Sequence, residues 1–453
     1  MPKPLTKQTR LLALAINLLQ LCCGTLIIAI LLILSGCHKT EVQTGGPVEI
    51  TLWHPWGSDQ AKGLQRIVDL YHHSQNRVRV RLVFTPTDLS TNQKFFTAVA
   101  ANKPPDASFV DGTQVAQWAE WGALLPLDKY IQQAGIKPTD YYDPCWKQAQ
   151  YQGQVWAMTY CADPNFAFCW NKELFRKAGL NPDQPPRTIE DIDAMAQKLT
   201  QDKNGRLLSL GIIPWSQYGS ANSVFTWGWA FGGKFYDEKN GRITANNPRV
   251  VKAVEWMASY AKKLGITRVN SATSGWGSGA SDPFITGNLA MRCVHISTLK
   301  DLTRYGPNLD YGIAPIPGTP DGEIGSSWVG GWLLALPRGC AHPDAAWDFV
   351  HWACATPEGT AAIAREVGLL PGYRRSPAIA QVKHDPRLGM FVKILEDSKH
   401  QRPVMPVQAF FMGALDRAVE RAIYAKQTPQ EAMDQATAET QRELDLVSGK
   451  KVQ

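Results

Sequence analysis

The chain of 453 residues is long enough for two domains with sizeable cores, and its 44% hydrophobic and 19% charged content excludes an intrinsically disordered protein. Lys and Arg outnumber Asp and Glu by 47 to 40, and three of the basic residues precede residue 37. The small surplus that remains is too dispersed to form the electrostatic surface that nucleic-acid binding requires.

The first 36 residues have the pattern of an export signal. A basic start is followed by an apolar run over residues 11–34, and this order is typical of a segment that directs a chain out of the cytoplasm. An uncleaved membrane helix over the same run is the alternative, because the run is long enough to span a bilayer. Both interpretations place the rest of the chain outside the cytoplasm. The basic residues are Lys3, Lys7 and Arg10.

The end of this segment, Leu34-Ser35-Gly36-Cys37, resembles the lipobox of bacterial lipoproteins. In those proteins the cysteine after the cleavage site carries lipid, so the resemblance implies a signal peptide over 1–36 and lipidation of Cys37. Residues 37–47 are polar and contain glycine, which suits a tether. We therefore expect the protein in the cell envelope, anchored through lipid to the extracytoplasmic (periplasmic) side of the inner membrane.

Six cysteines follow Cys37, an even number that permits disulfides in an exported protein. None has CxxC spacing and the histidines are not grouped with them, so we expect no metal site and no cofactor. Buried free thiols are the alternative to disulfides. The six are Cys145, Cys161, Cys169, Cys293, Cys340 and Cys354.

After residue 47 the pattern alternates between strand and helix. Apolar and polar residues alternate over 78–84, which predicts a strand with one exposed face. Apolar residues recur at helical spacing from Leu64 to Tyr71. This βαβαβ order predicts an α/β fold with a mostly parallel sheet covered by helices. The remaining elements of this region are strands over 48–53 and 106–111 and a helix over 91–102.

More helices and strands follow towards the end of the chain. Pro185-Pro186 introduces a helix over 188–200, and Asn247-Pro248 is a cap and first-turn pair for another. The C-terminal third has helical patterns, and Thr428-Pro429-Gln430-Glu431 fits a capping box. The expected strands lie over 154–160, 165–171, 289–295, 309–314 and 328–336.

Four motifs occur in order along the chain. The most specific is WNKELFRKAGL over 170–180, which continues through Pro185-Pro186-Arg187-Thr188. The others are FITGNLAM over 284–291, AAWDFV over 345–350 with TPE over 356–358, and TPQEA over 428–432. Together they resemble the family 1 extracellular solute-binding proteins of ABC importers, a group that contains binders of maltose, other oligosaccharides and glycerol-3-phosphate. The resemblance covers roughly residues 48–445.

The resemblance implies a two-lobed periplasmic-binding-protein fold, with a hinge between the lobes and the ligand in the interlobe cleft. It divides the chain into lobe one, 48–158 plus 284–325, and lobe two, 159–283 plus 326–453. It also implies a monomer that catalyses no reaction, traps a carbohydrate between its lobes and delivers it to the transmembrane subunits of an ABC permease.

A carbohydrate site needs aromatic surfaces for the C–H faces of the sugar, and carboxylates or amides for its hydroxyls. Tryptophans occur where the pattern predicts loops, and glycines next to Trp276 and Trp332 would let the backbone approach a ligand. Burial in a core is the alternative for each tryptophan. The candidates for ligand contact are Trp56, Trp215, Trp227, Trp229, Trp276, Gly330 and Trp332.

Three carboxylates join these candidates. Asp111 ends the third strand, Asp88 follows the second, and Asp163 lies where the chain is expected to cross between lobes. Turn formation is the alternative for Asp111 and Asp163, because each precedes Gly or Pro.

One arginine, Arg374, is the candidate for recognising a phosphorylated ligand. It lies near Gly368-Leu369-Leu370-Pro371, which resembles a ligand loop of the family, but Leu369 stands where the glycerol-phosphate binders usually carry Tyr. This departure favours a neutral sugar over glycerol-3-phosphate or a phosphodiester, which stay as the alternative ligands.

Two other functions are compatible with the sequence. An envelope carbohydrate-active enzyme would need two carboxylates about 5–10 Å apart, and the sequence does not exclude such a pair. It contains no G-x-S-x-G, H-E-x-x-H or P-loop motif, however. An envelope adhesion protein could use tryptophan-rich loops as an interface. Reversible ligand binding without turnover would separate a solute-binding protein from both.

Overall fold

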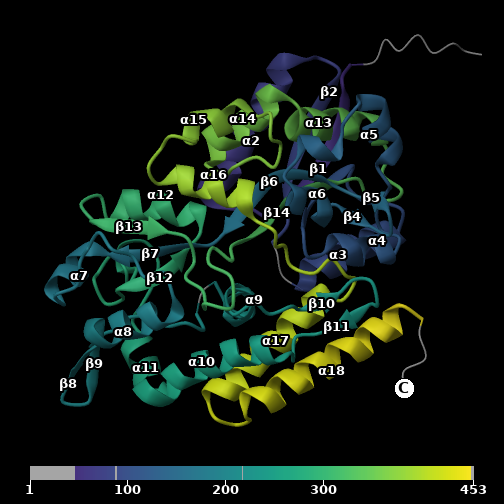
Figure 1. Cartoon of the computed structure of the whole chain (residues 1–453). Helices are drawn as coiled ribbons and strands as arrows, with labels where there is room; N and C mark the ends of the chain where they lie inside the picture. Colours follow the sequence, from purple (N-terminus) through teal and green to yellow (C-terminus); the bar gives the residue numbers. More distant parts are fainter. Residues whose placement is uncertain (1–45, 87–88, 217, 450–453) are drawn as a thin grey trace, which may run out of the picture. The chain divides into compact units, whose positions relative to one another are not determined.

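The computed structural model describes residues 46–86, 89–216 and 218–449. From Val48 onward the chain forms one compact unit (Figure 1). The expected signal peptide over 1–36, the lipidation site Cys37, all but the end of the tether and the candidate Asp88 lie outside the described residues. Among the helices within the described ranges, none is long and apolar enough to cross a bilayer.

A five-stranded sheet contains the first three strands of the chain, in the order β2-β1-β3-β14-β6. β1 runs parallel to β2 and β3, so Leu52 lies opposite both Leu82 and Ala107. The predicted βαβαβ start is thus confirmed, with α2 (Ser58–Ser74) and α3 (Leu89–Ala100) as its helices. β14 runs antiparallel to β3 and β6. The strands are β1 (Val48–His54), β2 (Val78–Phe84), β3 (Ala107–Asp111), β6 (Met158–Asn165) and β14 (Trp328–Ala335).

A second, three-stranded sheet is antiparallel and has β7 between β12 and β13. The Asn171 side chain ends β7 and caps α7 (Lys172–Lys177) by accepting a hydrogen bond from the Leu174 amide. The strand–turn–helix motif that carried the family resemblance therefore forms as expected. The strands are β7 (Ala167–Asn171), β12 (Met291–Val294) and β13 (Tyr311–Ala314).

Two hydrophobic cores support these sheets. The first surrounds the five-stranded sheet and includes Ile50 and Leu334, and we call the elements around it the first lobe. The second includes Trp227 and Phe411, and we call the elements around it the second lobe. Figure 1 shows the helices of the second lobe packed together at one end of the molecule. They are α9 (Ser220–Ala230), α10 (Pro248–Leu264), α17 (Gln408–Ile423) and α18 (Pro429–Val447).

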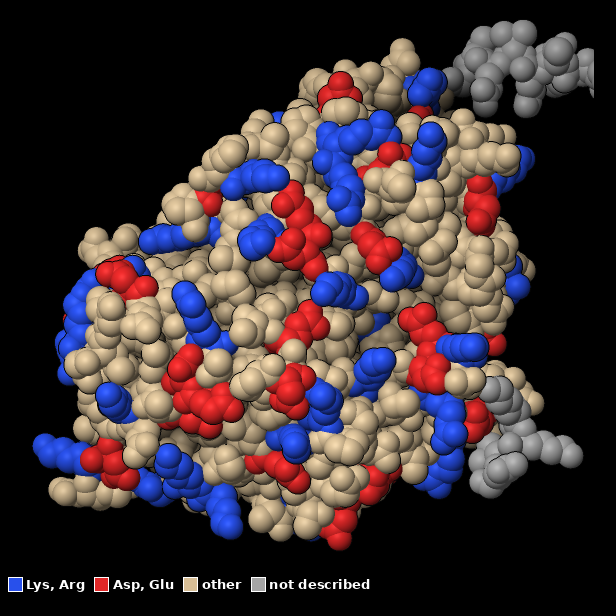
Figure 2. Space-filling model, viewed as in Figure 1, with Lys and Arg blue, Asp and Glu red and all other residues tan. Residues whose placement is uncertain are grey.

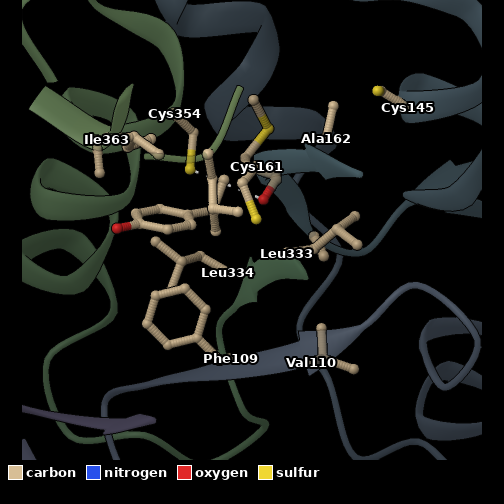
Figure 3. Close-up of a cluster of buried hydrophobic side chains, with 14 of the residues drawn as sticks. Phe109, Val110, Cys145, Cys161, Ala162, Leu333, Leu334, Cys354 and Ile363 are labelled. Carbon is tan, nitrogen blue, oxygen red and sulfur yellow. Dashed lines mark hydrogen bonds between the residues drawn. The ribbon is translucent and has the colours of Figure 1, made fainter. Parts of the chain in front are cut away.

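Figure 3 shows part of the first core, where the thiols of Cys161 and Cys354 lie among apolar side chains such as Leu334, while Cys145 stands apart in this view. All six cysteines of the described chain are free, and five of them are buried. Burial raises the pKa of Cys354 well above its ordinary value, and a protonated buried thiol is unreactive. The structure therefore supports free thiols rather than disulfides.

The segment 343–397 packs on the first lobe, which differs from the lobe assignment expected from the sequence. Phe349 and Ile363 lie in the first core, and Arg66 of α2 binds Glu366 at 2.7 Å. β12 and β13 pair with β7 and contribute to both cores, with Val294 and Tyr311 in the first and Met291 and Ala314 in the second. Local apolar patterns predict such elements but not the partner that each one meets. The helices of this segment are α13 (Pro343–Ala355), α14 (Pro357–Val367), α15 (Pro377–Val382) and α16 (Leu388–Asp397).

Three of the links between the two cores are the link from β6 to β7, the link from β13 to β14, and the link from α16 to α17. Ser327 connects all three. Its hydroxyl donates to the Phe166 carbonyl at 2.7 Å, and its carbonyl accepts from the Ser398 hydroxyl at 2.8 Å. The Val329 amide donates to the His400 carbonyl at 2.9 Å. Crossing segments bonded to one another in this way are suited to act as a hinge.

Glu323 and His400 form a side-chain pair that joins two of these crossing segments, with Oε2 and Nε2 2.8 Å apart. The hydrogen bond from His400 lowers the pKa of Glu323, although partial burial opposes the effect. A carboxyl group with a lowered folded-state pKa stabilises the fold above its ordinary pKa of 4.5, and this stabilisation is lost as the pH falls through the lowered value.

We therefore expect Glu323→Gln to lower the melting temperature at neutral pH by a few degrees, and to have no effect once the carboxyl group is protonated in strong acid. Thermal unfolding from neutral to strongly acidic pH measures this. Glu238→Gln, at an exposed position, is the control. A Glu323→Gln difference that stays constant over the whole pH range would contradict a role for the charged pair.

The other elements are short. The strand expected over 154–160 is interrupted, because Val155 ends one strand and Met158 begins another. The remaining helices are α4 (Val115–Glu120), α5 (Asp128–Ala134), α6 (Asp143–Gln148), α8 (Ile189–Leu199), α11 (Ile266–Thr273) and α12 (Ile296–Tyr305), with single 3-10 turns at Pro138–Asp140 and Gly279–Ser281. The hairpins are β4 (Gln150–Tyr151) with β5 (Gln154–Val155), β8 (Gln201–Lys203) with β9 (Arg206–Ser209), and β10 (Tyr236–Asp237) with β11 (Arg242–Ile243).

Figure 2 shows basic and acidic side chains interspersed over the visible face of the molecule. The mixture of signs matches the near balance of charge in the sequence after residue 37.

Candidate ligand-binding site

The register of the five-stranded sheet brings predicted site residues together next to the crossing segments. Trp332 of β14 pairs with Asp111 at the end of β3, and Gly330 of β14 pairs with Asp163 of β6. Trp56, in the loop after β1, has its ring centroid 6.0 Å from that of Trp332. We use the name central cluster for these five residues together with three described below, Tyr218, His295 and Arg402.

Arg402 is the cation of the central cluster. Its Nη2 lies 3.4 Å from Asp111 Oδ1, its Nη1 lies 3.6 Å from the sulfur of Met412, and its guanidinium stands 4.9 Å from the ring centroid of Trp328. Only 12% of its side chain is exposed. Burial lowers the pKa of Arg402, while Asp111 and Asp163 oppose the shift, and a guanidinium stays charged in any case. Its Nε is buried and has no hydrogen-bond partner among the described residues.

Asp163 is the second carboxylate, and His295 faces it with Nε2 3.5 Å from Oδ1. The Ser297 amide at the start of α12 donates to His295 Nδ1. The proton of the neutral imidazole therefore sits on Nε2, towards the carboxylate. Asp163 Oδ1 is buried and makes no hydrogen bond within the described chain. An acceptor in this state is costly unless a further donor reaches it, and a ligand hydroxyl is such a donor.

Tyr218 provides an accessible aromatic surface next to His295. Tyr218 is 59% exposed, and its ring centroid lies 5.3 Å from that of His295 and 5.8 Å from that of Phe166. Its backbone has φ +58°, immediately before Gly219 at φ +90°. A bulky residue in the left-handed region is uncommon, and such strain concentrates at functional sites. An exposed ring held in this way can stack against the C–H face of a sugar.

Sequence reasoning did not predict Arg402 or Tyr218. The contact of Arg402 with Asp111 joins residues 291 positions apart, so no local pattern marks it. Tyr218 precedes a glycine in a segment without helical or strand periodicity. This pattern indicates a loop and was the only sequence feature that could have marked Tyr218 as a site residue. His295 belongs to no motif in the sequence.

Three predicted tryptophans lie in the second core rather than in the central cluster. Trp227 is fully buried and its indole N–H donates to the Pro214 carbonyl at 2.8 Å. Trp229 is 6% exposed and stacks on the His400 ring at 4.7 Å. Trp215 is also buried there. Residues 227–229 belong to α9 rather than to a loop, and the missing side chain of Gly228 lets this helix pack directly against Phe235.

Trp276 lies in a separate groove of about 480 Å³, formed by β9, α11 and the loop that carries it. None of the central-cluster residues lines this groove. Figure 1 shows β9 and α11 at the end of the second lobe away from the five-stranded sheet. The glycines beside Trp276 thus belong to a surface loop of the second lobe.

Arg374 likewise lies outside the central cluster. Its Nε donates to the Tyr141 carbonyl at 2.9 Å, and its guanidinium stands 4.6 Å from the ring centroid of Tyr142. These contacts hold the loop after α14 against the first lobe.

These placements predict different results for two tryptophan variants. We expect Trp227→Ala to lower the free energy of unfolding by about 3–5 kcal/mol, because it leaves a large cavity in the second core. Trp276→Ala should leave ligand affinity unchanged and should cost less stability than Trp227→Ala, because Trp276 is only partly buried against the second core. Urea unfolding and calorimetric titration check both variants. If Trp276→Ala weakened ligand binding without changing stability, Trp276 would be a ligand-contacting residue after all.

The central cluster thus combines an exposed aromatic ring, two carboxylates, one guanidinium and an imidazole where both lobes meet the crossing segments. It can bind a polar ligand through a donor, Arg402 Nε–H, and an acceptor, Asp163 Oδ1. Within the described ranges, no group of three or more His, Cys, Asp and Glu side chains is arranged to hold a metal ion.

Residues 71–389, well over half of the chain, match the family described as bacterial extracellular solute-binding protein. The chain belongs to this family. The solute-binding protein has the α/β periplasmic-binding-protein fold that the sequence predicted, and the structure of CpMnBP1 with mannotriose bound is similar to it. The two share 28% identity at a TM-score of 0.77, over 87% of this chain and all of the other.

Two curated relatives have different ligands in their names. The maltotriose-binding protein of Pyrococcus abyssi is 22% identical over 85% of this chain and 79% of its own. The sn-glycerol-3-phosphate-binding periplasmic protein UgpB of Rhizobium meliloti is 24% identical over 61% of this chain and 63% of its own. Proteins of this family are transport receptors of ABC importers, so the prediction that this solute-binding protein is not an enzyme is confirmed.

Proposed function

We propose that this solute-binding protein captures an oligosaccharide outside the inner membrane and delivers it to the transmembrane subunits of an ABC permease. The observation that carries the proposal is a pair of buried polar atoms that make no hydrogen bond within the described chain, Arg402 Nε and Asp163 Oδ1. The exposed ring of Tyr218 lies next to His295, which faces Asp163. A sugar supplies hydroxyls that both accept and donate, and a C–H face for the ring.

The comparisons support the ligand class. CpMnBP1, which is 28% identical, is named with mannotriose bound, and a curated relative is named for maltotriose. Closure of the two lobes about the three crossing segments would bury such a ligand and shift the population to a closed form that the permease recognises.

The proposal includes the anchor. Cleavage after Gly36 and lipidation of Cys37 would hold the receptor as a monomer on the periplasmic side of the inner membrane. The mass of the mature N-terminal peptide tests this part, since an uncleaved chain would retain residues 1–36.

Glycerol-3-phosphate is the second candidate ligand. It is favoured by the UgpB relative and by the presence of a guanidinium, a group that binds phosphate well. The same assay distinguishes the two candidates.

The experiment is thermal unfolding of residues 38–453, which include the compact unit from Val48 onward, with a panel of neutral mono-, di- and trisaccharides, polyols and glycerol phosphates. A ligand at a hundred times its Kd adds about 2.7 kcal/mol of stability, which raises the melting temperature measurably. A shift with a di- or trisaccharide supports the proposal. A shift with glycerol-3-phosphate alone supports the second candidate, and no shift with any compound would overturn both.

A further inference from the structure

We infer that the central cluster selects an uncharged ligand, and that Asp111 is the residue that excludes anionic ones. The inference rests on the proposed function and names the charge class of its ligand. Its basis is that Arg402, the cation of the cluster, is already engaged by protein groups on several sides.

Protein groups contact Arg402 on several sides. Nη2 faces Asp111 at 3.4 Å, Nη1 faces the sulfur of Met412 at 3.6 Å, and Trp328 covers one face of the guanidinium at 4.9 Å. Recognition of a phosphate or carboxylate by arginine typically uses two parallel N–H groups. Here the nitrogen without a partner is Nε. An anion that used Nε and Nη2 as such a pair would lie against the Asp111 carboxylate, which already faces Nη2.

The charges of the cluster lead to the same conclusion. Asp111 and Asp163 have side chains that are 28% and 18% exposed, so solvent screens them only in part. Both act electrostatically on Arg402. With His295 neutral these groups carry one net negative charge, and with His295 protonated they carry none. An anion that enters the cluster therefore loses its hydration without meeting a net positive charge.

Asp111 is held in place independently of Arg402, which makes it a suitable position to test. Its Oδ1 accepts from the Thr113 amide at 2.9 Å and from the Thr113 hydroxyl at 2.6 Å. An asparagine can keep both bonds through its carbonyl oxygen. Asp111→Asn thus removes the charge opposite Arg402 and preserves the local turn.

The experiment is calorimetric titration of the wild type and two variants with neutral and anionic probes. The neutral probes are mannobiose, mannotriose and maltotriose, and the anionic probes are glucuronate, mannose 6-phosphate, sn-glycerol 3-phosphate and inorganic phosphate. Asp183→Asn is the control, because it removes an equal charge at a site that is 75% exposed and paired with Lys172. Melting temperatures establish that each variant is folded.

We expect the wild type to bind a neutral probe at least tenfold more tightly than any anionic probe. Asp111→Asn should reduce that ratio at least tenfold, and Asp183→Asn should leave it unchanged. A wild type that binds an anion as tightly as a sugar overturns the inference, whether or not Asp111→Asn folds. An unchanged ratio in folded Asp111→Asn also overturns it while the proposed function stands. Failure of the wild type to bind any probe overturns the proposed function itself.

Discussion

Replacement of Arg402 by Met is expected to weaken sugar binding by roughly 10- to 100-fold, because it removes a charged donor worth about 1.5–3 kcal/mol. The methionine keeps most of the apolar stem beside Trp328 and Met412. It leaves the carboxylates of Asp111 and Asp163 without their cation. Calorimetric titration with the sugar that raises the melting temperature gives the change in affinity directly.

The same variant should also be less stable. Breaking a buried ion pair typically costs about 3–5 kcal/mol, and we expect about 1–3 kcal/mol here because both carboxylates keep some contact with solvent. Urea unfolding measures this loss. Arg374→Met is the matched control, because Arg374 was predicted to bind ligand but contacts only the first lobe among the described residues. If Arg402→Met kept full affinity and Arg374→Met lost it, Arg374 rather than Arg402 would be the arginine that binds the ligand.

Gly331→Ala is expected to cause the largest loss of stability of any single methyl addition near the site. A Cβ at Gly331 would lie 2.2 Å from the Cys161 carbonyl oxygen, so β14 and β6 would have to move apart. The two strands are antiparallel, so β6 leads into one crossing segment and β14 leads out of another. We expect a loss of about 2–5 kcal/mol, measured by urea unfolding.

The neighbouring glycine is the control for this prediction. A Cβ at Gly330 would meet side-chain atoms of Trp328, Asn165 and Arg402 at 3.2–3.4 Å, and side chains can yield where backbone cannot. Gly330→Ala should therefore cost less than about 1 kcal/mol in stability and act mainly on ligand affinity. Equal stability of Gly331→Ala and the wild type would show that the close contact between β14 and β6 is not required.

The fold was predictable from the sequence where short-range patterns decide it. Alternation over 78–84 identified β2, and the Thr428 capping box identified the start of α18. The placement of 343–397 was not predictable from such patterns. Helices α13 and α14 have apolar faces that could cover either sheet, and their contact with α2 and the first core depends on long-range packing.

Site residues could be predicted from the sequence where they lie at the ends of expected strands, but not where they lie elsewhere. Asp111 and Asp163 were identified from their positions at the ends or crossings of expected strands, and the structure brings them together through β14. Arg402 could not be identified, because its role arises from a contact across 291 residues. Trp227 was misplaced because tryptophan next to glycine suggests a loop, whereas Gly228 here allows close packing of a helix.

The most direct test of the account is a crystal structure of residues 38–453 with the oligosaccharide that raises the melting temperature. We expect a sugar ring against Tyr218, with one hydroxyl or ring oxygen at Arg402 Nε and one hydroxyl at Asp163 Oδ1, between closed lobes. A sugar bound in the Trp276 groove, with the central cluster free of it, would contradict the account.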